Sequence, residues 1–475
     1  MIRYYLDSNI YRLMRPEYPF HSPDLLKTVD QAKGKVLFIF SDAHLADLKN
    51  SEKSYRDIDL AFMGTYVQDN YFAVNLNLEF QSYLASPLSA FYSKDYEAAE
   101  QIYHNPAFFD DLLKQLGDSP EAKKLKNLID NFFTQPLSFA QSMPDLKTMG
   151  QANIDMLYKI FPDFSPNMTL KQFVENNMRF ALAFKDDKKE MRKMKKYVAE
   201  NFNKENYNWD TWKEQFNLKF KETPLNKTFL EVVDGMQGEN RRNHWYSKVT
   251  NAYTLLEWFN ITEERTGKRP KQFTFSSLNQ DAQHVYYASF CDYLITDDRG
   301  MQLKAFIIYQ LFNISTQVLT VKDFINRNHE IEANEESART FTDALTYDLE
   351  HAFLLFSKPN ITSGALINTY RTSHSYFNYF NRFQVVSGSG RNHCVLYCER
   401  NSLSNFCLYR EIELLCKKII DIFGFDDDQM GHYKIEEKTS QPHVRQWTME
   451  KAIFQLLISE NNFGYYLCFC LIFNK

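Results

Sequence analysis

The chain has 475 residues, enough for two or three domains. Its 55 Lys and Arg against 60 Asp and Glu give a formal charge of −5, which excludes a surface that is basic all round for non-specific nucleic-acid binding. Only 14 Gly and 14 Pro exclude long low-complexity stretches, and the lack of long apolar runs excludes a predicted transmembrane helix.

The first predicted strand ends in an acid. Ile2 to Leu6 is rich in bulky β-formers, and Asp7 follows it at once. Ser8 and Asn9 come next, and such side chains satisfy the free N–H groups at the start of a helix. The opening residues therefore predict a strand, a carboxylate and a helix in direct succession.

A second strand and helix carry further acids. Val36 to Phe40 is a continuous apolar run, as expected of a strand that is buried on both faces. Ser41 is the expected N-cap of the next helix, and Asp47 lies nearly two turns into that helix. Asp42, one residue past the N-cap, is an alternative to Asp47 as a site residue.

Residues 96–245 are predicted to be mostly helical, because apolar residues recur there at spacings of three and four. Lys188, Arg192 and Lys196 share one face of such a helix and could follow a phosphate backbone. A solvated helix face is the alternative interpretation.

A second basic stretch stands near the end of that region. Arg241 and Arg242 precede Trp245, and cations beside an aromatic ring suit the stacking of nucleic-acid bases. The alternative is that Trp245 begins the core face of a helix that runs to Trp258.

The run from Asn279 to Asp298 predicts a helix that carries Asp281 near its start, followed by a short strand that ends in two acids. Neighbours on a strand point to opposite faces, so Asp297 is the weaker rival of Asp298. Crevices outside the carboxyl ends of parallel strands bind ligands in α/β proteins. Several carboxylates that meet there repel one another unless a cation lies between them, and hard oxygen ligands suit Mg²⁺ or Mn²⁺.

Two polar residues flank these acids. His284 shares a helix face with Asp281 and could contact a phosphate or a site carboxylate; a satisfied buried histidine is the alternative. Lys304, one turn beyond Asp298, could reach a phosphate, and solvent exposure is the expected alternative.

Taken together, the three segments resemble the PIN domain, a metal-dependent nuclease fold found in RNA-cleaving toxins and RNA-decay factors. The resemblance lies in Tyr4 to Asn9, in Ser41 to Leu48, and in Asp281, Ala288 and Thr296 to Asp298. It spans roughly residues 1–60 and 270–325.

Carried over residue by residue, the acidic quartet of this family falls on Asp7, Asp47, Asp281 and Asp298. The second acid of the family is usually Glu, so Asp47 is a departure with a shorter reach. The resemblance implies a three-layer α/β/α fold with a mostly parallel sheet. It also implies an endoribonuclease whose four acids hold Mg²⁺ or Mn²⁺ and activate water.

The groups expected to orient the carboxylates or the water are Ser8, Asn9, Thr296 and His284. The alternative is a PIN-like fold that no longer cleaves and serves as a scaffold for RNA or a protein partner.

The predicted organisation has four segments. Residues 1–95 and 246–328 form the two parts of the PIN-like domain, residues 96–245 a helical insertion, and residues 329–475 a separate α+β domain. Within the last segment, Tyr409 to Phe423 predicts an amphipathic helix. We expect the insertion or the last domain to select substrate, bind a protein partner or mediate homo-oligomers.

The cysteines and the start of the sequence bear on the compartment. Seven cysteines without a Cys-x-x-Cys pair, and no secretory pattern at the start, favour a reducing cytoplasm and no contact with membranes.

Overall fold

The structure is a computed structural model. The described residues are 1–75, 77–94, 216–222, 226–236, 244–258, 275–332, 337–359, 365–387, 393–400, 409–435, 437, 443–461 and 464–473, with scattered positions between 120 and 189. Most of the predicted insertion therefore lies outside the described residues, and so do all five of its predicted nucleic-acid contacts, Lys188, Arg192, Lys196, Arg241 and Arg242.

The first part of the molecule is built on a six-stranded sheet with the order β4-β3-β2-β1-β5-β6. Its strands are β1 (Arg3–Leu6), β2 (Leu37–Ser41), β3 (Asn70–Val74), β4 (Phe80–Leu84), β5 (Tyr293–Ile295) and β6 (Gln317–Leu319). All neighbouring pairs are parallel except β3 and β4, which form an antiparallel hairpin at one edge. The predicted α/β class with a mostly parallel sheet is confirmed.

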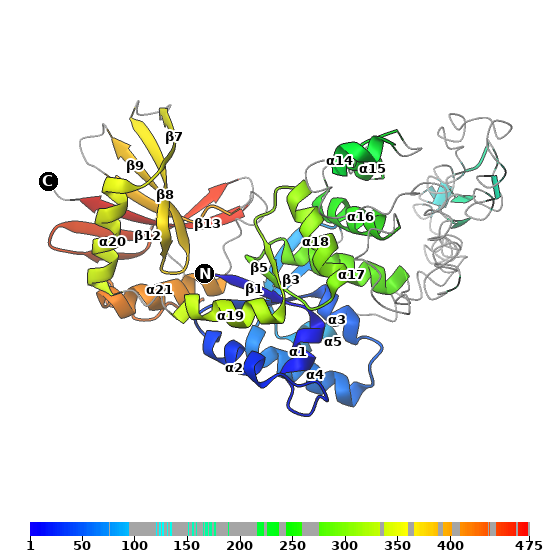
Figure 1. Ribbon diagram of the computed structural model, residues 1–475, viewed down its shortest axis with the longest axis horizontal. Coiled ribbons are helices and arrows are strands. Elements are labelled where there is room, and N and C mark those ends of the chain that lie inside the picture. The colour runs from blue at the N-terminus through cyan, green and yellow to red at the C-terminus, as the bar shows by residue number, and fades with distance from the viewer. Residues whose placement is uncertain are drawn as a thin grey trace.

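Helices cover both faces of this sheet (Figure 1). On one side lie α1 (Ser8–Met14), α2 (Pro23–Ala32), α4 (Lys53–Val67), α5 (Pro87–Tyr92) and α19 (Val321–Glu332). On the other lie α14 (Phe216–Lys219), the 3₁₀ turn η2 (Phe220–Glu222), α15 (Phe229–Gly235), α16 (Trp245–Trp258), α17 (Phe275–Ala288) and α18 (Arg299–Leu311), and α3 (Asp42–Leu48) follows β2 directly.

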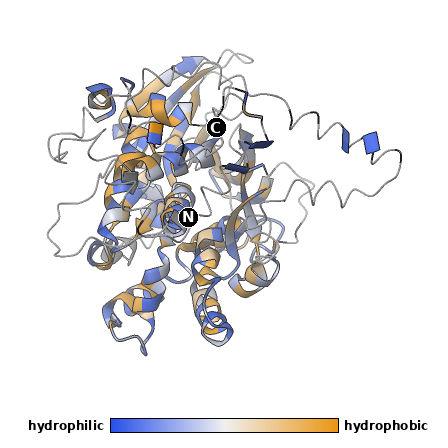
Figure 2. Ribbon diagram, turned by 90° about the vertical axis from the view of Figure 1, so that its right-hand side faces the viewer, coloured by the Kyte–Doolittle hydropathy of each residue, from blue (hydrophilic) through white to orange (hydrophobic). Residues whose placement is uncertain are grey.

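Strand alternation explains how one sheet fills two cores. Tyr5 and Ile39 belong to the core on the α16–α18 side, whereas Tyr4, Phe38 and Phe40 belong to the core on the α1–α2 side. Both faces of the central strands are buried, which is why their sequences read as continuous apolar runs. Hydrophobic and hydrophilic residues alternate along the surrounding helices, as expected of amphipathic elements (Figure 2).

The C-terminal part is a seven-stranded antiparallel sheet with the order β11-β12-β13-β10-β9-β8-β7. Its strands are β7 (Leu354–Pro359), β8 (Leu366–Tyr376), β9 (Phe380–Ser387), β10 (His393–Tyr397), β11 (His443–Thr448), β12 (Ala452–Asn461) and β13 (Gly464–Phe473). Two helices, α20 (Ala338–His351) and α21 (Tyr409–Phe423), contribute Phe341 and Phe423 to the core that this sheet covers. The helix over Tyr409–Phe423 has the bounds that the sequence predicts.

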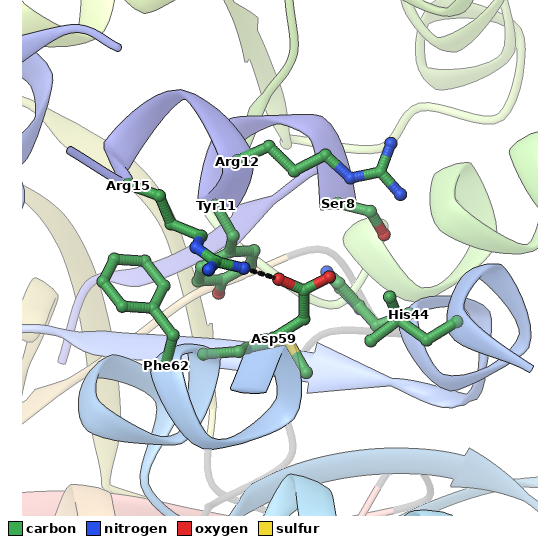
Figure 3. Close-up of a pocket in the computed structure, with 9 residues that line it drawn as sticks. Ser8, Tyr11, Arg12, Arg15, His44, Asp59 and Phe62 are labelled. Carbon is green, nitrogen blue, oxygen red and sulfur yellow. Dashed lines mark hydrogen bonds and ion pairs between the residues drawn. The ribbon is translucent and has the colours of Figure 1, made fainter. Parts of the chain in front are cut away.

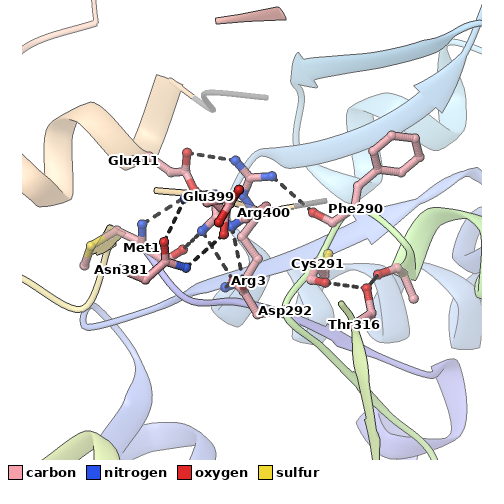
Figure 4. Close-up of polar contacts among 11 residues, drawn as sticks. Met1, Arg3, Phe290, Cys291, Asp292, Thr316, Asn381, Glu399, Arg400 and Glu411 are labelled. Atoms are coloured by element: carbon pink, nitrogen blue, oxygen red, sulfur yellow. Dashed lines mark hydrogen bonds and ion pairs between the residues drawn. The ribbon is translucent and has the colours of Figure 1, made fainter. Parts of the chain in front are cut away.

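A buried ion network joins the two sheets (Figure 4). Arg3 of β1 donates two hydrogen bonds to Glu411 of α21, at 2.7 and 2.9 Å, and neither side chain is exposed to solvent. Arg400 donates to Glu411 at 3.3 Å and to Asp292, just before β5, at 3.2 Å. Helix α21 therefore holds the starting ends of β1 and β5, the two strands that end at the predicted acids.

Candidate active site

The centre of the candidate site lies where β1 and β5 end side by side. The chain leaves β1 toward β2 and leaves β5 toward β6, so the connections diverge on opposite sides of this point. Such a switch point opens a crevice at the carboxyl ends of the strands. Asp7 follows β1 and Asp298 follows β5 closely, so the topology brings both acids to this crevice.

Thr296 links the two acids. Its hydroxyl donates a hydrogen bond to Oδ2 of Asp7 at 3.0 Å and accepts one from the backbone N–H of Asp298 at 3.1 Å. Thr296 and Asp7 are both buried. The sequence predicted Thr296 to orient a carboxylate, and the structure places it in contact with one.

The carboxylates of Asp297 and Asp298 accept hydrogen bonds from two different helices. Oδ1 of Asp298 accepts from the N–H of Met301 at 3.1 Å and caps α18. Oδ1 of Asp297 accepts instead from the N–H of Val321 at 2.9 Å, at the start of α19. Asp298 therefore belongs to the crevice, and its rival Asp297 serves a neighbouring helix.

Asp47 reaches the same region from α3, where two polar groups hold it. The Ser8 hydroxyl donates to Oδ2 of Asp47 at 2.5 Å, and Nε2 of His284 donates to the same oxygen at 2.9 Å. Burial alone would raise the pKa of Asp47, but the charge and hydrogen bond of His284 and the hydrogen bond of Ser8 outweigh it and lower the pKa.

His284 is a buried histidine that also contacts a site carboxylate. Burial favours its neutral form, but Asp47, Asp7 and Asp281 together raise its pKa. Nδ1 of His284 also shares a hydrogen bond with the Tyr5 hydroxyl, 2.8 Å away. Helix α17 thus supplies a cation next to the acids.

A chain of hydrogen bonds continues from His284 into the core. The Tyr5 hydroxyl shares a hydrogen bond with Ser41 Oγ, 2.6 Å away. His44 accepts from the N–H of Ser41 at 3.1 Å and donates from Nε2 to the carbonyl of Leu6 at 2.7 Å. Burial and the charge of His284 lower the pKa of His44 to about 3, so His44 stays neutral. Every side chain in this series of hydrogen bonds has a defined partner, which fixes the orientation of His284.

Asp7 and Asp281 are the acids near this network whose pKa values are raised. Burial raises the pKa of Asp7, and the charges of Asp47 and Asp298 add to the shift. Burial also raises the pKa of Asp281 to about 7, against an attraction to Lys304. The Asp281 carboxylate accepts no hydrogen bond from any side chain or backbone group that the structure describes. Each acid would be stabilised by a cation.

Lys304 is buried, so the expectation of solvent exposure is wrong. Its ammonium forms an ion pair with Glu257 of α16 and lies 4.6 Å above the centre of the Tyr253 ring. Glu257 is also buried. Glu257 and Tyr253 could not be predicted from the sequence, because nothing local to α16 marks them and only the packing of α16 against α17 and α18 brings them here.

The Tyr253 hydroxyl is a buried donor without a hydrogen-bond partner in the part of the chain described. Burial raises its pKa first, and then the charges of Asp281, Glu257, Asp298 and Asp7 raise it further. A buried unsatisfied hydroxyl surrounded by acids is a place for a water molecule or a ligand oxygen.

Two candidates from the sequence lie elsewhere. Asp42 forms an ion pair with Lys94 and accepts hydrogen bonds from the hydroxyls of Tyr71 and Tyr287, so its carboxylate is already occupied. Asn9, expected to help orient the site, lies exposed on α1.

A pocket adjoins Ser8 and His44 (Figure 3). Arg12 and Arg15 of α1 lie in its wall, and Asp59 holds Arg15 in an ion pair. The guanidinium of Arg12 extends past Ser8, and it has no ion pair with any residue that the structure describes. Arg12 stands one helical turn after Ser8, a spacing by which the sequence alone could have signalled it.

The donor set fits a hard divalent cation, because it consists of carboxylates and two of them have raised pKa values. In the conformation described, however, no three His, Cys, Asp or Glu side chains among the described residues stand close enough to coordinate one ion.

Comparisons with protein-family models, curated proteins and solved structures gave no significant match to this chain. Among the residues described, no helix is both long and apolar enough to cross a bilayer.

Proposed function

We propose that this protein is a PIN-like, metal-dependent nuclease that hydrolyses phosphodiester bonds in RNA. The observation that carries the proposal is the pairing of Asp7 and Asp298 at the ends of adjacent parallel strands, joined through the Thr296 hydroxyl. The raised pKa values of Asp7 and Asp281 also support it. RNA as the substrate follows from the sequence resemblance.

Asp7, Asp281 and Asp298 would hold the Mg²⁺ or Mn²⁺ ion. In such a site the ion activates a water nucleophile and stabilises negative charge on the phosphoryl oxygens. Thr296 holds Asp7 in place, and Ser8 and His284 hold Asp47. In this arrangement Asp47 does not bind the metal ion directly. It holds His284 in place beside the other acids.

The substrate phosphate needs a cation as well as the metal. Arg12 meets this need, because its guanidinium extends past Ser8, whose hydroxyl contacts Asp47. A planar guanidinium suits two oxygens of one phosphate group. We assign to Arg12 the binding of a backbone phosphate next to the cleaved bond.

A non-catalytic scaffold that binds RNA or a protein is the second candidate. The ion pair of Asp47 and His284 favours it, because this pair already neutralises one member of the quartet. It is also favoured because no three acids or histidines among the described residues lie close enough to hold one ion. In this case the crevice would bind nucleic acid or a protein without cleaving.

Cleavage of RNA decides between the two. We expect purified protein to cut a pool of single-stranded and structured RNA with Mn²⁺ and not with EDTA, and Asp281→Asn to lose this activity. The matched control is Asp343→Asn, an equivalent change at an exposed helix position, which should cut like wild type. Mn²⁺ should also raise the melting temperature of wild type, and less so that of Asp7→Asn. Absence of cutting by folded wild type with either metal would favour the scaffold.

A further inference from the structure

The seven-stranded C-terminal sheet has two faces of different character. Phe383 and Leu396 point to one face, where they join the core that contains residues of α20 and α21. Gln384 and Tyr397, their neighbours along β9 and β10, point to the opposite face, because side chains alternate along a strand. Both are half-buried. We call this side of the sheet the outer face; it includes the strand positions that pair in register with these two.

Two arginines stand opposite each other on the outer face. Arg371 of β8 pairs in register with Arg382 of β9, which pairs in turn with Tyr397 of β10. Side chains directly opposite on antiparallel strands are close neighbours, so these two like charges repel. Glu399, just after β10, neutralises Arg382 over 2.6 Å. Arg371 is exposed and has no side-chain hydrogen bond or ion pair with any residue that the structure describes, so its charge is open to an anionic ligand.

Exposed aromatic rings lie beside these cations. Phe353 stands opposite Arg371 in register, and the backbone N–H of Arg371 donates to the Phe353 carbonyl at 3.1 Å. Phe356 of β7 lies on the same face, opposite Thr369. Phe353 is 73% exposed and Phe356 is 45% exposed. One row across the sheet therefore carries an exposed ring, two guanidinium groups and the half-buried ring of Tyr397.

The strand positions of the outer face carry cations and no acid in the described part of the chain. By alternation and register, their charged members are Lys358, Arg371 and Arg382. The chain as a whole has a formal charge of −5, so this cluster is a local reversal of sign. A basic area on an acidic chain favours an anionic ligand.

Single-stranded nucleic acid suits both features of the outer face. Its phosphates attract guanidinium groups, and its unpaired bases stack on exposed aromatic rings. A double helix keeps its base faces stacked on one another, so it could use the cations but would leave Phe353 and Phe356 without a partner.

We propose that the outer face of the C-terminal sheet is a binding site for single-stranded RNA, separate from the carboxylate crevice. Arg371 and Arg382 contact the phosphates, and the rings of Phe353 and Tyr397 stack on bases. The choice of RNA rests on the proposed function, whereas the site itself requires no cleavage. It holds one part of a long RNA while the crevice acts on another part.

Binding of a labelled oligouridine in EDTA, followed by fluorescence anisotropy, tests this site without cleavage. We expect Arg371→Gln and Phe353→Ala each to weaken binding about tenfold. Arg371→Gln should also reduce the slope of log affinity against log salt concentration by about 0.7, because one phosphate contact is lost. This variant should melt no lower than wild type, since it removes a repulsion with Arg382.

Matched controls are Phe20→Ala and Arg339→Gln. Phe20 is 73% exposed, like Phe353, and Arg339 is 91% exposed on α20, so both variants should bind oligouridine like wild type. No binding by folded wild type, or equal affinity in all four variants, would overturn the inference. Loss in Arg371→Gln without loss in Phe353→Ala would also overturn it, because charge attraction without stacking fits an acidic protein surface instead.

Cleavage separates this inference from the proposed function. Oligouridine binding that depends on Phe353 and Arg371, in a protein that cuts no RNA with Mn²⁺, would overturn the nuclease and keep the binding site. Cutting by wild type, with no effect of either substitution on oligouridine binding, would overturn the binding site and keep the nuclease.

Discussion

Nε2 of His284 donates a hydrogen bond to Oδ2 of Asp47 over 2.9 Å, although the two residues are 237 positions apart in the chain. His284 is 1% exposed and Asp47 is 22% exposed. The pair joins α17 to α3 across the crevice. It gives the cluster a cation that the protein supplies itself.

The first prediction concerns the pH dependence of this pair. The raised pKa of His284 means that its contribution to stability is complete below the ordinary value of 6.5 and is lost as pH rises through the higher folded value. The lowered pKa of Asp47 means that its contribution is lost as pH falls below 3.8. Between these limits, His284→Asn should reduce the free energy of unfolding by about 3 kcal/mol.

Urea unfolding at pH 5.5 and at pH 9 would measure this difference. The cost of His284→Asn should be smaller at the higher pH. Asp57→Asn is a suitable control, because Asp57 pairs with Lys53 on an exposed helix face and its loss should cost little stability at either pH. An equal cost of His284→Asn at both pH values would show that folding does not raise the pKa of His284.

The second prediction is that Asp281→Asn stabilises the metal-free protein. Folded Asp281 keeps its proton up to pH about 7, whereas the unfolded chain releases it near 3.8. Ionised Asp281 therefore lowers stability progressively as pH rises from 3.8 to 7. In EDTA at pH 8, the variant should be more stable than wild type by about 3 kcal/mol, and below pH 3.8 the difference should vanish.

Thermal and urea unfolding in EDTA would measure the effect of Asp281→Asn. Saturating Mn²⁺ should reverse the order, because the metal stabilises only a protein that retains its ligands. A less stable variant in EDTA at pH 8 would mean that the attraction of Lys304 and His284 exceeds the cost of burying the Asp281 charge.

The third prediction concerns the connection between the two sheets. Burial would raise the pKa of Glu411, but Arg3 and its other cationic neighbours lower it to about 2. The contribution of Glu411 to stability is therefore complete above 4.5 and is lost as pH falls through about 2. At neutral pH, Glu411→Gln should cost about 3 kcal/mol, because Arg3 stays buried without its partner.

The double variant Arg3→Met with Glu411→Leu should recover most of that loss, since an apolar pair of similar volume replaces two buried charges. Equilibrium unfolding of Arg3→Met, of Glu411→Leu and of the double variant would give the coupling energy between the two residues. A coupling near zero would mean that Arg400 and Asp292 hold the two parts together without this pair.

The fourth prediction tests the gap beside Asp298. Gly300→Ala places a methyl group 3.2 Å from the Asp298 carboxylate, so this side chain must shift. We expect Mn²⁺ affinity to fall severalfold while the fold persists. Gly235→Ala is the control, because no atom lies within 4 Å of its added methyl group; it should stabilise the protein by about 0.5 kcal/mol and leave Mn²⁺ binding unchanged. Equal Mn²⁺ affinity in both variants would place the metal away from Asp298.

Several local features could be predicted from the sequence because their causes are local. Ser41 caps α3 through a hydrogen bond from the N–H of Ala43. Asp298 caps α18, and Val36 to Phe40 contains a strand buried on both faces. The order of strands and helices around Asp7, Asp281 and Asp298 follows the same local patterns.

The partners of these residues could not be predicted in this way. The sequence indicates that His284 could contact an acid, but it does not show that Asp47 is its partner, that Lys304 is buried against Glu257, or that Arg3 meets Glu411, 408 positions away. Each contact depends on how elements far apart in the chain pack together, and neighbouring residues carry no record of that packing.

The amino-acid sequence by itself therefore determined which acids follow which strands, because strand alternation and helix capping act within a few residues. Only the tertiary structure decided which of those acids have raised pKa values. Burial and the distance to His284 and Lys304 set the charge balance of the crevice, and both arise from the packing of α16, α17 and α18 against the sheet.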